Sequence, residues 1–476
     1  MKRKLSFAEA ILPILVMLVL LGFGYGFKQW KAEPLLLVAA AVAAFVAKRA
    51  GVTWEEMMEG IVEKLAKSMP ATLILITVGL LIGTWMISGT IPMMIYYGVQ
   101  IINPKFILIA AFLVTAVVST FTGTSWGSVG TVGVALMGIA SGLGVSLPAT
   151  AGAVVAGSYF GDKLSPLSDT TNLAPIAAGS ELYEHIKHML YTTIPAFIIS
   201  LIVYGLVGVN STSVAVDNPE KVQIMLQTLD TIFNWNLLLL IPPVIVIYGS
   251  VAKKPTIPTM LGSSFVAALM GVFMQGFTFK DALNSMVGGF NVSMVQIEGF
   301  DPTTVIWEVT RLINRGGMNS MMGTVLIAFC AFAFAGIVSK AGCLEVILER
   351  LVKSIKSTGG IIAATVASCI TMALVTGSSY LSILIPGELF AETYKAKGLH
   401  AKNLSRTLED SGTVVVPLVP WSMAGVYMAS TLGVPVIEYA PWAFLCYLGF
   451  ITAIIYGFTG FGIAKIDDSN NKKIVA

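Results

Sequence analysis

Residues 106–128 read FILIAAFLVTAVVSTFTGTSWGS, an apolar run that ends in a polar break containing two glycines. A helix needs about 20 apolar residues to cross the hydrocarbon core of a bilayer, and this run approaches that length. Irregular backbone inside a membrane is tolerated only where protein buries it or where it lines a wet cavity. The segment therefore predicts a membrane protein in which a helix is interrupted at an internal site.

The composition indicates the same class. Charged residues make up 12% of the 476 residues, whereas soluble proteins carry about 25%. Further apolar runs near this length lie at residues 10–27, 71–87, 189–209, 237–251 and 442–458. The basic residues are dispersed, so no nucleic acid is expected as a partner, and the four cysteines have no metal-ligand spacing. We expect an all-α polytopic protein in a lipid bilayer, not an enzyme, with no cofactor.

The polar break has a counterpart later in the chain. Thr122–Trp126 is similar to Thr376–Tyr380 at an offset of 254 residues, and Ser165–Ser168 is similar to Val419–Ser422 at the same offset. Two further matches, at offsets of 225 and 253, relate Gly51–Met58 to Gly276–Leu283 and the pair Gly83 and Gly89 to Gly336 and Gly342. Collinear matches of this kind indicate an internal repeat. We predict repeat 1 at residues 1–209, a linker at 210–234 and repeat 2 at 235–476, with an insertion of about 28 residues between Phe290 and Gly323.

The loop charges predict how the repeats cross the membrane. Lys and Arg collect in cytoplasmic loops, so residues 2–4, Lys48 and Arg49 place the N-terminus in the cytoplasm. The other basic loops stay cytoplasmic only if residues 106–143 and 361–394 are re-entrant hairpins rather than full spans. Each repeat then has five crossings, an odd number, plus one hairpin, so the repeats are inverted and the C-terminus is also cytoplasmic. Arg311 and Arg315 fall outside and oppose this scheme.

Two other kinds of helix are expected. Residues 150–178 and 404–432 each carry a second polar break and are predicted to form discontinuous helices near the membrane midplane. The segments from Thr53 to Met69 and from Cys343 to Ser357 are amphipathic. We expect these two segments to lie along the membrane surface.

The breaks have the composition of a cation site. Asp162 and Asp169 lie two helical turns apart, and Pro166 between them frees local carbonyl groups. Inverted-repeat transporters bind ions where half-helix ends and freed carbonyls meet, and an acidic residue inside a membrane is a functional hypothesis by default. A proton or a sodium ion can neutralise such a carboxylate, and loss of water favours the protonated form. Mutually exclusive binding of the two ions is the simplest exchange mechanism.

We predict two sets of site residues. The proton- and sodium-coupling acids are Asp169 and Asp410, followed by Asp162 and Glu388. The ion or substrate ligands are polar side chains of the four breaks: Thr122, Thr124, Ser125, Ser128, Ser165, Ser168, Thr170, Thr171, Asn172, Thr376, Ser378, Ser379, Thr413, Trp421 and Ser422. No metal is expected beyond the transported sodium.

Each of these residues also has a purely structural interpretation. The glycines fit close helix packing, and a Ser or Thr hydroxyl in a membrane helix often bonds only its own backbone. Asp162 precedes Lys163, which suggests a local ion pair or a position in a cytoplasmic loop. Glu409 and Asp410 follow Arg406 and suit a helix cap. The histidines lie in charged segments and are expected to be solvated loop residues: His185, His188 and His400.

The runs Gly123–Ser128, Gly161–Ala174 and Leu408–Thr413, with Pro420 and Trp421, resemble the NhaC-type Na+/H+ antiporter family of the wider ion-transporter superfamily. The likeness covers nearly the whole chain. It implies secondary active transport in a bacterial or archaeal plasma membrane, with sodium ions and protons as partners. The superfamily likeness implies paired hairpins and discontinuous helices that move as an elevator against a fixed scaffold. A homodimer is left open.

Other functions are weighed against sodium/proton antiport. The family also includes sodium-lactate/malate-proton exchangers and amino-acid carriers, so sodium-coupled transport of a small organic acid or amino acid is the first alternative. The break motifs contain no arginine to clamp a carboxylate, which favours the pure ion exchanger. Gly123–Gly127 satisfies GxSxG, but an intramembrane serine hydrolase would need a nearby histidine base. A channel is disfavoured because no ring of pore-lining charge is evident.

Overall fold

The computed structural model describes residues 3–210, 219–353 and 357–466. Within these ranges the regular structure is helical, apart from one antiparallel bridge between Leu399 and Lys465. Eight of the described helices are long and apolar enough to cross a membrane, or up to eleven if each bent helix pair is one span. The predicted all-α polytopic class is therefore confirmed. Part of the predicted linker (211–218) and the basic residues Lys472 and Lys473 lie outside the described residues.

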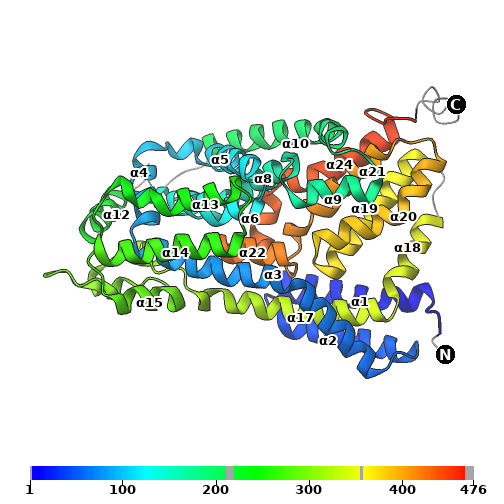
Figure 1. The fold of residues 1–476 in the computed structure, drawn as a ribbon, viewed down its shortest axis with the longest axis horizontal. Helices are drawn as coiled ribbons and strands as arrows, with labels where there is room; N and C mark the ends of the chain where they lie inside the picture. The colour runs from blue at the N-terminus through cyan, green and yellow to red at the C-terminus, as the bar shows by residue number, and fades with distance from the viewer. Residues whose placement is uncertain (1–2, 211–218, 354–356, 467–476) are drawn as a thin grey trace.

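The helices run mostly along the long axis of the molecule, with α18 and α20 at one end and α4 and α12 at the other (Figure 1). The helices of the first half are α1 (Phe7–Val19, continued by a π-helix at Leu20–Phe27), α2 (Ala32–Arg49), α3 (Trp54–Ile87), α4 (Thr90–Ile101), α5 (Ile107–Thr122), α6 (Ser125–Ser128), α7 (Val134–Leu143), α8 (Leu147–Leu164), α9 (Asp169–Ala178) and α10 (Leu182–Asn210). Those of the second half are α12 (Pro219–Ile232), α13 (Ile241–Val251), α14 (Thr256–Phe273), α15 (Phe279–Gly288), α16 (Trp307–Ile313), α17 (Met322–Lys340), α18 (Cys343–Lys353), α19 (Thr358–Thr376), α20 (Ser379–Ala396), α21 (Ala401–Leu408), α22 (Met423–Leu432), α23 (Val436–Tyr439) and α24 (Phe444–Thr459).

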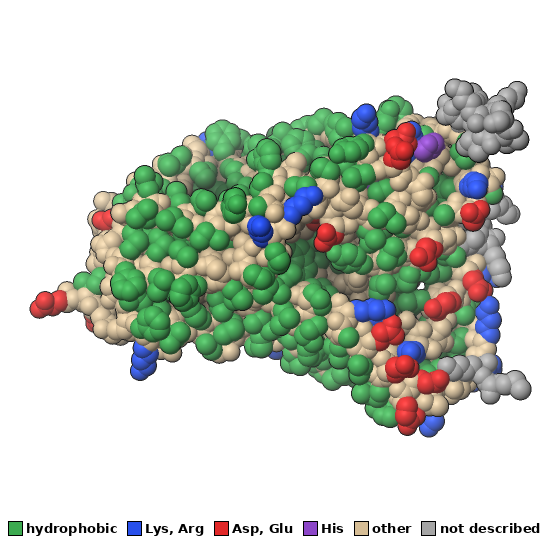
Figure 2. Space-filling view, in the orientation of Figure 1, with side chains coloured by type: hydrophobic (Ala, Val, Ile, Leu, Met, Phe, Trp, Pro, Cys, Tyr) green, Lys and Arg blue, Asp and Glu red, His purple; other side chains and the backbone are tan. Residues whose placement is uncertain are grey.

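The surface divides into an apolar part and a charged end. Hydrophobic side chains cover most of the visible face over α10, α13 and α14, whereas acidic and basic side chains gather at the end that carries α18 and α20 (Figure 2). Large apolar residues such as Leu237 and Phe273 are more than four-fifths exposed. A broad apolar belt bounded by charge is what a protein surrounded by hydrocarbon requires.

Helix α3 corrects one expectation about the first half. The segment from Thr53 to Met69 is not a separate surface helix but the first part of one continuous helix, Trp54–Ile87. A capping box between Thr53 and Glu56 begins it, and it continues through Pro70. The segment packs along α17, and Lys340 at the end of α17 forms an ion pair with Glu59 at 3.0 Å. This packing stabilises the helix on both sides of the proline, which by itself tends to kink a helix.

The polar breaks interrupt helices at matched positions of the two halves. Gly123 (φ 67°) ends α5 and Gly377 (φ 62°) ends α19, both in the left-handed conformation that glycine adopts without strain. Thr124 and Ser378 then precede the next helices as N-cap residues. The N-caps of α9 and α22, Ser168 and Ser422, stand at the same offset of 254 residues. The inverted orientation of the halves, their boundaries and the re-entrant hairpins stay predictions.

The histidines of α10 contradict the expectation that they are solvated loop residues. His185 and His188 belong to α10, and their side chains are buried. The His185 Nδ1 atom lies 2.9 Å from Ser405 Oγ, and the His188 Nε2 atom lies 3.2 Å from Asn403 Oδ1. Both partners belong to α21, more than 200 residues away, so packing between the halves buries side chains that local charge had suggested were solvated.

Candidate functional site

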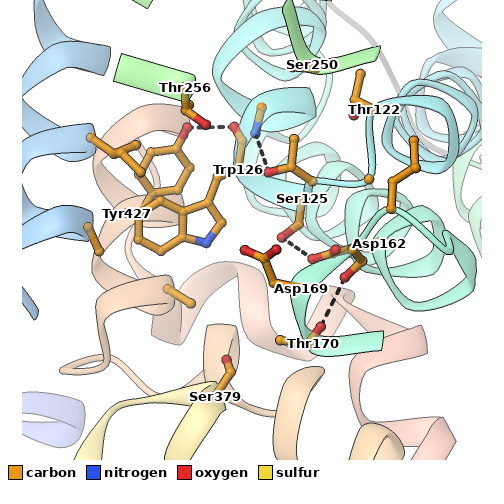
Figure 3. A pocket seen from close by; sticks show the side chains of 18 of the residues that line it. Thr122, Ser125, Trp126, Asp162, Asp169, Thr170, Ser250, Thr256, Ser379 and Tyr427 are labelled. Atoms are coloured by element: carbon orange, nitrogen blue, oxygen red, sulfur yellow. Dashed lines mark hydrogen bonds between the residues drawn. The ribbon is translucent and has the colours of Figure 1, made fainter. Parts of the chain in front are cut away.

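A cavity of about 600 Å³ lies where the interrupted helices meet (Figure 3). Residues of the α5–α6, α8–α9 and α19–α20 breaks line it, together with Thr413 from the π-helix that follows α21. The predicted site residues that line it are Thr122, Thr124, Ser125, Asp162, Ser168, Asp169, Thr170, Asn172, Ser378, Ser379 and Thr413. The fold thus gathers most of the predicted ligands from both halves around one space.

Asp162 is the buried carboxylate of this cavity. It lies in the last turn of α8 and is 8% exposed. The Ser125 hydroxyl, at the start of α6, donates a hydrogen bond of 2.7 Å to Asp162 Oδ2. Within the described part of the chain, Asp162 has no basic partner in an ion pair. A buried negative charge without a cation of its own favours a bound cation or a proton.

The break between α8 and α9 shapes the wall beside Asp162. The Thr171 hydroxyl donates to the carbonyl oxygens of Asp162 and Lys163, both at 3.0 Å, and so closes the interrupted backbone. The Asn172 side-chain amide donates to Pro166 O at 2.9 Å. Ser168 caps α9 by accepting from Thr171 N. These bonds satisfy backbone groups that the break would leave unpaired.

Asp169 occupies a different environment from Asp162. It is the first residue of α9, is exposed, and accepts a hydrogen bond of 3.0 Å from the Tyr380 hydroxyl of α20. The contact joins the two halves of the chain at the cavity. Because water reaches Asp169, its charge does not need a bound ion to be stabilised.

A cluster of charged residues is buried behind the cavity. The Lys163 ammonium group pairs with Asp410 Oδ1, and the two side chains are 2% and 0% exposed. Glu409 Oε1 accepts from Thr170 Oγ1 at 3.2 Å, and Arg406 donates to Gly462 O at 2.8 Å. The side chains of Lys163, Asp410, Glu409 and Arg406 are all buried. None of these four residues lines the cavity.

This cluster revises one sequence interpretation, because Lys163 pairs with Asp410 rather than with its neighbour Asp162. Glu409 is the C-cap residue of α21, and Asp410 directly after it is buried in the interior. The sequence carried no indication of which of these charges would meet.

The remaining predicted residues lie away from the cavity. Glu388 is exposed on α20. Ser128 donates to Ser125 O at 2.9 Å, Thr376 donates to Met372 O at 2.7 Å and Ser422 donates to Val416 O at 2.6 Å. Ser165 accepts from Leu167 N at 3.3 Å, and Trp421 donates to Leu374 O at 2.7 Å. The four hydroxyls among these residues bond backbone groups, as expected for hydroxyls in membrane helices.

The opposite wall of the cavity is aromatic and apolar. The rings of Trp126 and Tyr427 stack with centroids 4.3 Å apart and planes 12° apart. The Tyr427 hydroxyl donates to Trp126 O at 2.7 Å, which fixes the pair. Lys253 and Lys254, in the turn between α13 and α14, also line the cavity and are exposed. None of the four was predicted as a site residue. Trp126 lies within the first polar break but carries no oxygen ligand, and no polar break marks α13, α14 or α22 as a wall of the site.

Comparison with known proteins relates the sequence of this chain to antiporters. The model of the family described as "Na+/H+ antiporter family" matches residues 157–461. A Haemophilus influenzae protein named as an uncharacterised Na+/H+ antiporter is 54% identical, over 96% of this chain and 97% of its own. The Na+/H+ antiporter NhaC of Alkalihalophilus pseudofirmus is 38% identical over 93% and 94% of the two chains. A malate-2H+/Na+-lactate antiporter of Bacillus subtilis is 34% identical over 89% and 88%.

Proposed function

This chain belongs to the Na+/H+ antiporter family, and we propose that it exchanges sodium ions for protons across the membrane that its helices span. The resemblance to NhaC-type antiporters that the break motifs indicated is confirmed by full-length relatives. One structural observation supports the exchange most directly. Asp162 is a buried carboxylate that faces an oxygen-lined cavity and has a hydroxyl partner but no cationic one among the described residues.

The proposed mechanism uses Asp162 as a seat that sodium and protons share. A sodium ion would take the Asp162 carboxylate and the Ser125 hydroxyl oxygen as ligands, with hydroxyls of the neighbouring breaks completing the shell. The Ser125 hydroxyl can rotate, so it donates to the empty carboxylate and offers a lone pair to a bound ion. A proton on the carboxyl group removes the charge that holds sodium. Binding of either ion thus excludes the other, and the carrier moves with its buried charge neutralised.

The structure changes the ranking of the predicted acids in this proposal. Asp169 is exposed, so we assign it to attracting cations into the cavity rather than to holding them. Lys163 already neutralises Asp410, so we assign Asp410 to supporting the seat. Asp162, ranked third from sequence, becomes the first candidate. No resident cofactor is needed, because ion binding and carrier movement suffice.

The proposal also covers the membrane in which the protein lies and the movement by which it carries ions. We propose a bacterial or archaeal plasma membrane with both termini in the cytoplasm, supported by the loop charges. We also propose elevator-type movement. Support for it comes from the contacts Asp169–Tyr380 and Lys163–Asp410, which would let the breaks of the two halves travel as one body.

The proposal is tested with purified protein in proteoliposomes. An outward-directed proton gradient should drive uptake of radioactive sodium, and Asp162→Asn should abolish it while the protein remains folded. Asp301→Asn, in an exposed loop after α15, is the matched carboxyl control and should exchange normally. Sodium uptake that persists in Asp162→Asn would remove this residue as the seat. Absence of proton-driven sodium uptake in the unchanged protein would remove the proposed exchange.

Sodium-coupled transport of an organic acid is the second candidate. It is favoured by the size of the cavity and by Lys253 and Lys254 on its lining, which could receive a carboxylate. A relative is named as a malate and lactate antiporter. Sodium-dependent uptake of lactate or malate into the same proteoliposomes would select this function.

A further inference from the structure

The cavity is larger than a sodium ion requires. Its volume of about 600 Å³ falls in the range of small-molecule sites, which is about 300–1,000 Å³. A sodium ion with its oxygen ligands would occupy only the end beside Asp162. The rest of the cavity is therefore available to the body of a larger cation.

The two walls of the cavity differ in chemistry. Figure 3 shows the stacked rings of Trp126 and Tyr427 on one side and the side chains of Ser125 and Asp162 on the other, with Asp169 between them. Ile74, Val246, Met260 and Met423 extend the apolar lining. A molecule that matches both walls has a cationic end for the carboxylates and a hydrocarbon part for the rings.

The polar end suits an ammonium group. A primary ammonium carries three hydrogen-bond donors and no acceptor, and Asp162 and Ser125 offer oxygen acceptors 2.7 Å apart. Asp162 is more than nine-tenths buried, so a cation there is poorly screened. Lys253 and Lys254 are exposed to water, which screens their repulsion of an entering cation. The buried carboxylate therefore dominates the electrostatics of the cavity.

We propose that the cavity binds small primary alkylammonium ions in competition with sodium, with the ammonium group at Asp162 and Ser125 and the alkyl chain along the Trp126–Tyr427 wall. This inference rests on the proposed function in taking Asp162 as the cation seat. Each methylene buried against the apolar wall contributes transfer free energy, so affinity rises about threefold to fourfold per methylene. A site shaped for a bare ion alone would show the opposite trend, because larger cations would fit it less well.

The test measures binding, because neutral amines cross bilayers and collapse proton gradients. The purified full chain in detergent is titrated calorimetrically with methylammonium, ethylammonium and n-propylammonium chloride, with and without sodium chloride. We expect affinity to rise along the series and sodium to compete with each member. Affinity that is constant or falls with chain length would overturn the inference, as would binding unaffected by sodium. Binding of propionate in place of n-propylammonium would also overturn it and would favour the organic-acid function.

Substitutions of Trp126 test whether the alkyl chain contacts the Trp126–Tyr427 wall. Trp126→Ala should weaken n-propylammonium relative to sodium by about tenfold, whereas Trp126→Phe should restore most of the preference because it keeps an aromatic ring. Trp307→Ala is the matched control, since that ring is 67% exposed on α16 and does not line the cavity. An equal loss in Trp126→Ala and Trp307→Ala would overturn the assignment. If sodium binds and exchanges while no alkylammonium ion binds, the further inference fails and the proposed function stands; if sodium itself neither binds nor exchanges, the proposed function fails.

Discussion

The Lys163 ammonium group pairs with the Asp410 carboxylate across the two halves of the chain, one residue beyond the carboxylate that faces the cavity. The pair joins the end of α8 to the π-helix after α21, and both side chains are removed from water. It leaves Asp162 as the buried carboxylate of the cavity without an ion-pair partner among the described residues. Because Lys163 is already paired with Asp410, the negative charge of Asp162 remains available to an ion.

Breaking the Lys163–Asp410 pair should destabilise the folded protein. Lys163→Met leaves Asp410 buried without its partner and should reduce the free energy of unfolding by about 3–5 kcal/mol. Chemical denaturation in detergent micelles measures the change. Adding Asp410→Leu should recover much of the loss, because an apolar pair of similar volume removes the unpaired charge. Lys67→Ala, which breaks an exposed pair with Glu63, is the control and should cost about 0–1 kcal/mol. Equal effects of Lys163→Met and Lys67→Ala would contradict the buried pair.

The Ser125 hydroxyl should matter for sodium binding. Ser125→Ala removes the donor to Asp162 Oδ2 and one oxygen ligand of the proposed seat. A hydrogen bond to a charged group is worth about 1.5–3 kcal/mol, so the half-saturating sodium concentration should rise by about tenfold or more. Ser128→Ala is the same substitution but removes only a hydrogen bond to Ser125 O. It should change the half-saturating sodium concentration little. Indistinguishable sodium dependence in the two variants would argue against Ser125 as a ligand.

A shared seat predicts a particular pH dependence. Protons and sodium compete for Asp162, so lowering the pH should raise the half-saturating sodium concentration. Where the seat is mostly protonated, the increase should approach about tenfold per pH unit, and it should vanish at high pH where the seat is ionised. Initial rates of sodium uptake at several fixed pH values test this. A half-saturating concentration that does not depend on pH would mean that the two ions do not share one carboxylate.

The variant Asp169→Asn should show whether Asp169 attracts cations into the cavity or binds them itself. Because Asp169 is exposed, its charge acts over a distance and is screened by salt. Exchange should persist in this variant, with sodium affinity weakened a few-fold at low ionic strength. Added choline chloride should shrink the difference from the unchanged protein. Complete loss of exchange would instead make Asp169 the seat, as the sequence ranking proposed.

The break at Gly123 should tolerate no side chain. Its φ of 67° is strained for other residues, and a Cβ atom there would lie 2.5 Å from Leu167 Cβ in the α8–α9 break. Gly123→Ala should therefore lower the midpoint temperature of unfolding. It should also weaken sodium affinity, because Leu167 must move. Gly179→Ala is matched in backbone, with φ of 73°, but a Cβ atom there meets open space. It should cost about 1 kcal/mol in stability and leave exchange intact. Similar sodium affinity in both variants would show that the Leu167 contact does not position the site.

The sequence by itself determined the membrane class, the family and the places where helices are interrupted. Hydrophobic length, glycine at the end of a helix and a hydroxyl at the start of the next are local properties, so the breaks at Gly123 and Gly377 could be read from neighbouring residues. The same local reasoning failed at α3, where packing on α17 carries one helix through Pro70.

Tertiary structure alone decided how the site is arranged. Asp162 and Asp169 are equally acidic in sequence, but only packing buries the first beside Ser125 and leaves the second in water. The partners of Lys163, Asp169 and His185 lie more than 200 residues away, and Trp126 and Tyr427 meet across the two halves. Burial and charge pairing depend on what folding brings close in space, and no spacing along the chain encodes those distances.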